Sequence, residues 1–68
     1  MGASKKIRMI LLDKDKTTRG FAGEIGMLPQ TLYNKLQRDT MGYKEVERLA
    51  EALGCEIVFK DKETGKEY

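Results

Sequence analysis

The stretch GMLPQTLYNKLQRD, residues 26–39, places a glycine and a proline directly before a polar run with helical spacing. Pro29 suits the first position of a helix, because the N–H that proline lacks would have no partner there and its fixed φ matches helix entry. Leu32 and Leu36 are four residues apart, as the buried side of a helix requires. We therefore expect a helix that begins at Pro29, buries both leucines and turns its amide and basic side chains outward.

A shorter helix is expected just before this one, within TTRGFAGEIG, residues 17–26. Either Thr17 or Thr18 can cap its start, and Gly26 lies where a left-handed residue commonly ends a helix. The apolar residues on its expected buried side are Phe21, Ala22 and Ile25. Because only about three residues, 26–28, separate the two helices, we expect a tight helix-turn-helix corner.

Helical spacing also marks the segments on both sides. In SKKIRMILLDKDK, residues 4–16, Ser4 is available as the N-cap. The apolar stripe of this first segment is Ile7, Ile10 and Leu11. In YKEVERLAEALG, residues 43–54, the helical period returns and Gly54 ends it. The apolar positions of this last segment are Val46, Leu49, Ala50 and Leu53.

The tail changes to an alternating pattern. In CEIVFK, residues 55–60, Cys55, Ile57 and Phe59 fall on one side of an extended chain, and a turn-rich DKETG and a short KEY follow. The pattern predicts a small β-hairpin over about residues 55–68, with Ile57 and Phe59 covering the core. We therefore predict a mainly α fold, in which residues 1–68 form a single four-helix domain followed by this C-terminal β-hairpin.

Charge is unevenly distributed along the 68 residues. Residues 1–42 carry eight cations and four acids, a net charge of +4, whereas the remaining 26 residues carry five cations and seven acids, a net charge of −2. A basic first part and a mildly acidic tail suit a domain that presents one face to a polyanion.

Catalysis and cofactor binding are not expected. With no histidine and only Cys55, the chain lacks the usual metal-ligand cluster, disulfide and nucleophile–base pair. The longest apolar run, residues 9–12, is far below the ~20 residues that span a bilayer, and no signal peptide can be assembled. We therefore expect a cytoplasmic, non-enzymatic protein without a cofactor or metal.

Residues 17–38 resemble the helix-turn-helix of the phage Cro and repressor class, the xenobiotic-response-element family with a lambda-repressor-like fold. The residues that carry the resemblance are Thr17 at the helix start, Phe21 and Ala22, the turn Ile25, Gly26 and Met27, and Leu32. The likeness extends over residues 5–54. The chain departs from the family at Leu28, where a Ser or Thr cap is usual, at Thr18, where glutamine is frequent, and at Lys35, whose usual apolar role passes to Leu36.

The resemblance implies a sequence-specific regulator that binds double-stranded DNA, most simply a repressor. It places Pro29, Gln30 and Asn34 at base-facing positions of the recognition helix. Gln30 and Asn34 share a face, and each amide offers the donor and acceptor that match adenine in the major groove. The expected phosphate contacts are Thr18, Arg19, Tyr33, Lys35 and Arg38. For each cation the alternative is a solvated surface charge.

The tail and the first helix suggest a homodimer on a pseudo-palindromic operator. Val58 lies on the other face of the ribbon, and the edge of a two-strand ribbon has unpaired N–H and C=O groups. Two copies could pair these edges, with help from Met9 and Leu12, and set two recognition helices about 34 Å apart. The alternative is that lysines within residues 60–66 guard the edge and the ribbon only caps the core, with Met9 and Leu12 at the edge of the core.

A protein-interaction module is the other function left open by the sequence. An antitoxin-like or inhibitor-like subunit can keep a helix-turn-helix fold without reading DNA, because fold alone does not determine function. The missing cap at Leu28 and the modest net charge of +2 favour this alternative, while the basic first part of the chain favours DNA.

Overall fold

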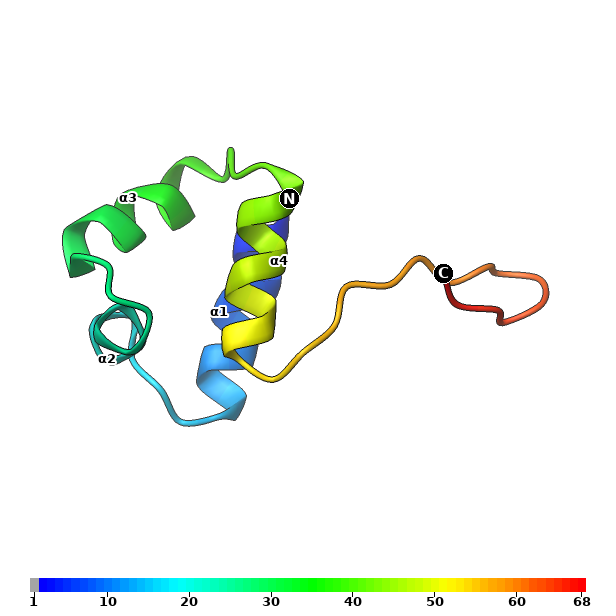
Figure 1. Ribbon diagram of the computed structural model, residues 1–68, viewed down its shortest axis with the longest axis horizontal. Coiled ribbons are helices and arrows are strands. Elements are labelled where there is room, and N and C mark those ends of the chain that lie inside the picture. The colour runs from blue at the N-terminus through cyan, green and yellow to red at the C-terminus, as the bar shows by residue number, and fades with distance from the viewer. Residues whose placement is uncertain (1) are drawn as a thin grey trace.

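The computed structural model describes residues 2–68, and these residues form four helices in the predicted order. The helices are α1 (Ala3–Asp13), α2 (Thr18–Glu24), α3 (Pro29–Arg38) and α4 (Tyr43–Ala52). α1 and α4 pack side by side, α1 also contacts α3, and α2 packs against α3 (Figure 1). The prediction of a mainly helical, four-helix domain is confirmed.

One apolar core joins all four helices. Its buried members are Ile7, Leu11, Phe21, Ala22, Leu32, Leu36, Leu49 and Leu53. The side chains of Phe21, Leu32 and Leu49 are completely buried. Most of the predicted stripe positions are therefore correct, while Ile10 and Ile25 pack against the core and are only partly buried.

Backbone geometry fixes where α2 and α3 begin. Thr17 is the N-cap of α2, and its hydroxyl accepts a 3.0 Å hydrogen bond from the amide of Gly20, which leaves Thr18 as the first helical residue. α3 begins at Pro29 as predicted, after Leu28, which has no side-chain capping bond. Gly26 has a φ of +70°, the left-handed conformation expected at the end of the preceding helix.

The start of α1 is capped by a residue from a distant part of the sequence. Ser4 was expected to be the N-cap, but α1 begins at Ala3, and Ser4 is a buried residue inside the first turn. The amide of Ser4 donates a 3.1 Å hydrogen bond to Oδ1 of Asp39, the left-handed residue that follows α3. A Cβ at Gly2 would lie 2.5 Å from Oδ2 of Asp39, so a glycine there permits this close approach. The Ser4 prediction was wrong because the capping group is 35 residues away in the sequence.

The predicted β-hairpin of residues 55–68 does not form, since residues 2–68 contain no strand. Lys60 and Glu67 make one isolated antiparallel bridge, and the amide of Asp61 donates a 2.8 Å hydrogen bond to the carbonyl of Lys66. After the turn only residues 66–68 return, and these pair with residues 59–61. Residues 55–58 are then left without a strand partner, although their alternation is typical of a strand.

The tail projects away from the helical body (Figure 1). Cys55 packs against the core and Ile57 is half-buried. Phe59 is 67% exposed, so the expectation that it covers the core was wrong. None of the helices in residues 2–68 combines the length and the apolar character needed to cross a membrane.

Replacing Asp39 should test the long-range cap through its pH dependence. The hydrogen bond from the Ser4 amide lowers the pKa of Asp39 in the folded chain. A lowered folded pKa stabilises the fold above the unfolded pKa of about 3.9, and the contribution is lost as the pH falls through the folded pKa. We expect Asp39→Asn to melt below the wild type at about pH 7, with the difference shrinking toward about pH 2.

Asp15→Asn is the matched control for this measurement. Asp15 has the same left-handed backbone as Asp39, with φ of 57° against 55°, and asparagine tolerates that conformation equally at both sites. Its replacement changes the net charge by the same amount. An equal, equally pH-dependent loss of melting temperature in both variants would contradict a specific cap at Asp39.

Candidate functional site

The turn between α2 and α3 is held from both sides. The amide of Met27 donates a 2.9 Å hydrogen bond to the carbonyl of Ala22, which closes the end of α2. From α4, the guanidinium of Arg48 donates a 3.1 Å hydrogen bond to the carbonyl of Ile25. Because the turn is bonded to α2 and to α4, the direction in which α3 leaves it is set by the domain as a whole.

The rotation of α3 about its axis follows from its two buried leucines. Leu32 and Leu36 point into the core, and Asn34 lies two residues from each of them. Since successive helical residues are rotated by about 100°, Asn34 is on the opposite side of the helix. Gln30 and Arg38, one turn before and after Asn34, share this outward face, and all three are exposed.

The two predicted base-reading amides are bonded to each other. Nε2 of Gln30 donates a 3.0 Å hydrogen bond to Oδ1 of Asn34 on the exposed surface. This bond leaves the side-chain oxygen of Gln30 free to accept a hydrogen bond and the side-chain NH2 group of Asn34 free to donate one. The pair is therefore oriented as one unit, with a donor and an acceptor toward solvent.

The other predicted contacts lie around this face at different depths. Pro29 is exposed, and Tyr33 is 50% exposed on the flank of α3. Arg19 is exposed in the first turn of α2, whereas Thr18 is partly buried. Pro29 borders the turn between α2 and α3, whereas Thr18 and Arg19 lie at the opposite end of α2.

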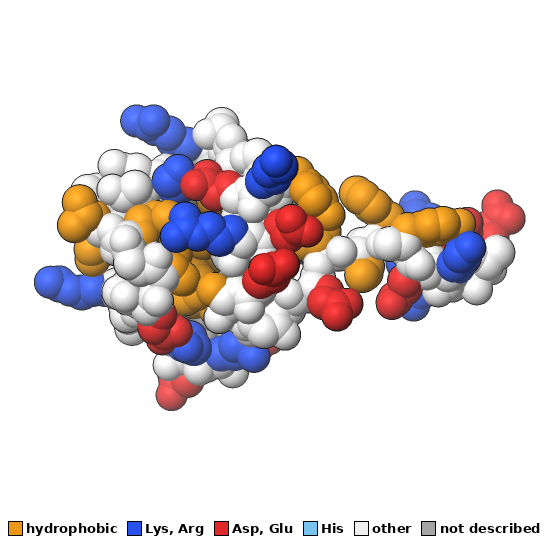
Figure 2. All heavy atoms as spheres, viewed as in Figure 1, with side chains coloured by type: hydrophobic (Ala, Val, Ile, Leu, Met, Phe, Trp, Pro, Cys, Tyr) orange, Lys and Arg blue, Asp and Glu red, His pale blue; other side chains and the backbone are white. Residues whose placement is uncertain are grey.

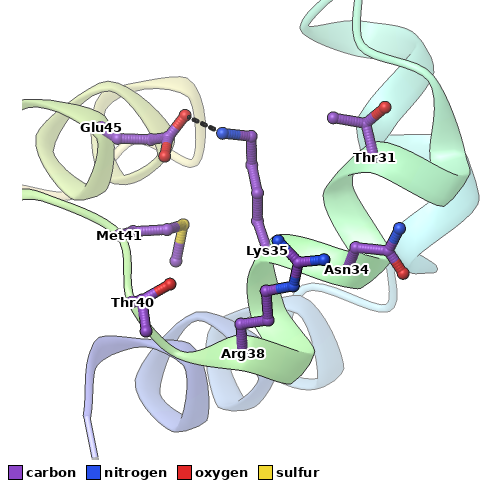
Figure 3. Close-up of a pocket in the computed structure, with 7 residues that line it drawn as sticks. All are labelled: Thr31, Asn34, Lys35, Arg38, Thr40, Met41 and Glu45. Atoms are coloured by element: carbon purple, nitrogen blue, oxygen red, sulfur yellow. Dashed lines mark hydrogen bonds and ion pairs between the residues drawn. The ribbon is translucent and has the colours of Figure 1, made fainter.

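A shallow polar hollow of about 330 Å³ lies between α3 and the start of α4 (Figure 3). Its lining residues are Thr31, Asn34, Lys35, Arg38, Thr40, Met41 and Glu45. Lys35 extends across the hollow, and its Nζ is 2.7 Å from Oε2 of Glu45. The side chains of Lys35 and Glu45 are 35% and 29% exposed, so water covers the pair only partly. Lys35, predicted to contact phosphate, is thus ion-paired within the chain.

The predicted dimerisation residues fall on two surfaces. Val58 lines an apolar hollow between α1, α4 and the tail, together with Ile10 and Ile57. Met9 and Leu12 are 55% and 78% exposed on α1 and are not among the lining residues of that hollow. Val58 and Ile10 therefore line one hollow, while Met9 and Leu12 lie outside it.

Acidic side chains gather on one part of the visible face. Figure 2 shows them over α4 and the base of the tail, whereas the part formed by α2 and α3 carries basic side chains mixed with acidic ones. Glu47, Glu51 and Glu56 line a further hollow there, beside Val58 and Tyr68. Within residues 2–68, no three His, Cys, Asp or Glu side chains come together as a possible metal site.

Sequence reasoning missed three residues of the site. Thr31 lies beside Asn34 in the hollow, and helical rotation alone could have placed it there. Glu45 and Arg48 come from α4 and reach Lys35 and the turn, respectively. These contacts depend on how α4 packs against the α2–α3 unit, for which the local sequence gives no signal.

No family model, no curated protein and no solved structure matches this chain. The site is therefore described by its own geometry: a short helix pair in which the second helix buries two leucines and turns an amide pair and an arginine to solvent.

Proposed function

We propose that the protein is a sequence-specific regulator of transcription that binds double-stranded DNA through a Cro/repressor-type helix-turn-helix formed by α2 and α3. The observation that carries the proposal is the outward face of α3, where Gln30 and Asn34 form one hydrogen-bonded amide unit opposite the buried leucines. The major groove of B-DNA admits an α-helix, and amides at its exposed face can pair with base edges.

Base readout would come from the first two turns of α3. In the hydrogen-bonded pair, Gln30 keeps a free acceptor and Asn34 keeps free donors. An adenine presents an acceptor at N7 and a donor at N6, so the pair complements this base. Pro29 would supply an apolar contact, such as one with a thymine methyl group.

Phosphate contacts would come from the rim of the same surface. Arg38 lies one turn beyond Asn34, and Arg19 is exposed at the start of α2. Thr18 and Tyr33 carry hydroxyl groups that can donate to phosphate oxygens. Lys35 differs from these residues because its ammonium group already has a carboxylate partner.

Repression would follow from occupancy of a pseudo-palindromic operator by a homodimer. Val58, Met9 and Leu12 are exposed apolar residues, as an interface requires. Without strands in residues 55–68, pairing of ribbon edges no longer supports the dimer, and contact between apolar side chains takes its place. A twofold axis would set the two copies of α3 about 34 Å apart.

A protein-interaction module of the antitoxin or inhibitor type is the second candidate. Leu28 is 73% exposed directly before α3, and Tyr33 is 50% exposed on its flank. Exposed apolar and aromatic side chains are typical of protein interfaces, whereas charges are depleted from their cores. The ion pair at Lys35 also removes one free cation from the α3 surface.

Salt dependence separates these two candidates. We expect the binding constant for duplex DNA to fall with salt concentration, with a log–log slope of about −0.9 per phosphate contact. Arg38→Ala should make this slope shallower by about 0.9, on preferred and random sequences alike. Lys62→Ala is the control, because it removes one exposed cation from the tail. Fluorescence anisotropy with a labelled duplex pool measures the slope for both variants. Absence of binding even at low salt would leave the interaction module as the proposal.

Replacement of the amide pair should remove discrimination between sequences. We expect Gln30→Ala or Asn34→Ala to cost about 1 to 3 kcal/mol on the preferred site and little on random DNA. Because the two amides are hydrogen-bonded, the double variant should cost less than the sum of the two losses. Gln37→Ala is the control, since the Gln37 amide accepts a 3.1 Å hydrogen bond from Arg8. Equal losses on both DNA classes for Gln30→Ala would mean that α3 does not read bases.

The dimer is tested by mass. We expect the full chain to be dimeric by light scattering and Val58→Lys to shift it toward the monomer, because a charge would enter an apolar interface. Thr64→Lys adds the same charge at an exposed position in the tail turn and should leave the mass unchanged. A wild-type protein that is monomeric at high concentration, both free and on DNA, would exclude the homodimer.

A further inference from the structure

The ion pair between Lys35 and Glu45 connects the DNA-facing helix of the proposed function to the helix behind it. Nζ of Lys35 lies 2.7 Å from Oε2 of Glu45 across the hollow between α3 and α4 (Figure 3). Both side chains are about one-third exposed, so solvent and salt screen the pair less than a fully exposed one. This geometry holds the ammonium group toward α4.

The position of Glu45 in its own helix favours the charged form that pairs with Lys35. It lies in the first turn of α4, whose N-cap is Gly42 and has no side-chain capping bond. The free amide groups and the positive end of the helix dipole stabilise a carboxylate in a first turn. The carboxylate is thus stabilised by its own helix as well as by Lys35.

Arg38 shares the hollow but not the ion pair. Its side chain reaches into the same space from the last turn of α3 (Figure 3), and the ion pairs found in residues 2–68 do not include it. Of the two cations beside Asn34, one is therefore available to an incoming anion and the other is neutralised within the chain.

We propose that Glu45 limits the affinity of α3 for DNA by competing with a backbone phosphate for Lys35. This inference rests on the proposed DNA-binding function and adds an affinity-limiting residue to it. The ammonium group of Lys35 carries one positive charge, which Glu45 neutralises at 2.7 Å, and the carboxylate repels a phosphate that approaches the same nitrogen. With Glu45 in place, the hollow offers one free cation, Arg38, and without the Glu45 charge it offers two.

Glu45→Gln is the direct test, with affinity measured at several salt concentrations. We expect this variant to bind preferred and random duplexes more tightly at low salt, with a log–log slope steeper by about 0.9 per subunit. Over a roughly fourfold rise in salt, the variant should therefore lose about 3.5-fold more affinity per subunit than the wild type.

Glu47→Gln is the matched control. It makes the same change in net charge on the same helix, and Glu47 is exposed and lies only two residues away. Residues two apart on a helix do not face each other, and Glu47 lines the separate acidic hollow with Glu51. We expect its slope to equal that of the wild type.

Lys35→Gln tests the same claim without altering Glu45. In the wild-type background it should leave the slope unchanged, because the ammonium group is already engaged. In the Glu45→Gln background it should return the steeper slope to the wild-type value. Circular dichroism of each variant checks that the helical fold is kept.

The outcomes separate this inference from the function on which it rests. If the wild type binds DNA and Glu45→Gln has the same slope as Glu47→Gln, the competition is refuted and DNA binding stands. A slope lowered by about 0.9 in Lys35→Gln alone also refutes it, because Lys35 would already contact phosphate. If neither the wild type nor Glu45→Gln binds duplex DNA at low salt, the proposed function and this inference both fail.

Discussion

Burial of Leu32 and Leu36 in the core fixes the rotation of α3, and the outward surface of the domain depends on that rotation. Both leucines are almost completely buried, at 0% and 2% exposure. Successive side chains of a helix are rotated by about 100° about its axis. A shift of the buried stripe by one position would therefore place a neighbour of Asn34 at the outward position. Leu36 instead of residue 35 completes the stripe, so Lys35 lies on the flank, within reach of α4. The ion pair with Glu45 is a consequence of where the leucines are.

The short helices are held by groups from distant parts of the chain. Asp39 caps α1 through the amide of Ser4, and Arg48 of α4 bonds the turn before α3. Isolated helices of about ten residues are marginal in water, so tertiary contacts must supply most of their stability. The contacts at both ends of α3 therefore stabilise the fold and also set the position of the outward amide pair.

The sequence predicted those elements whose signals are local. Pro29 and the spacing of the leucines predicted the start and the buried face of α3, and Gly26 predicted the end of α2. Residues 55–60 also alternate as a strand does, but a strand needs a partner, and the returning segment pairs only with residues 59–61. The cap of α1 and the Lys35–Glu45 pair could not be predicted from the sequence, because each joins residues that only the tertiary fold brings together.

Charge counted along the sequence also misses pairs that only the tertiary fold brings together. Dividing the chain after residue 42 assigns Lys35 to the basic part and Glu45 to the acidic part, yet their charged atoms are 2.7 Å apart in the fold. Lys16 is likewise bonded to Glu24 at 2.7 Å. Two cations of the basic part thus face carboxylates, while Arg19 and Arg38 are in neither of the ion pairs found in residues 2–68. The electrostatic character of the α2–α3 surface therefore depends on which of its charges remain unpaired, and the net charge of the chain describes it poorly.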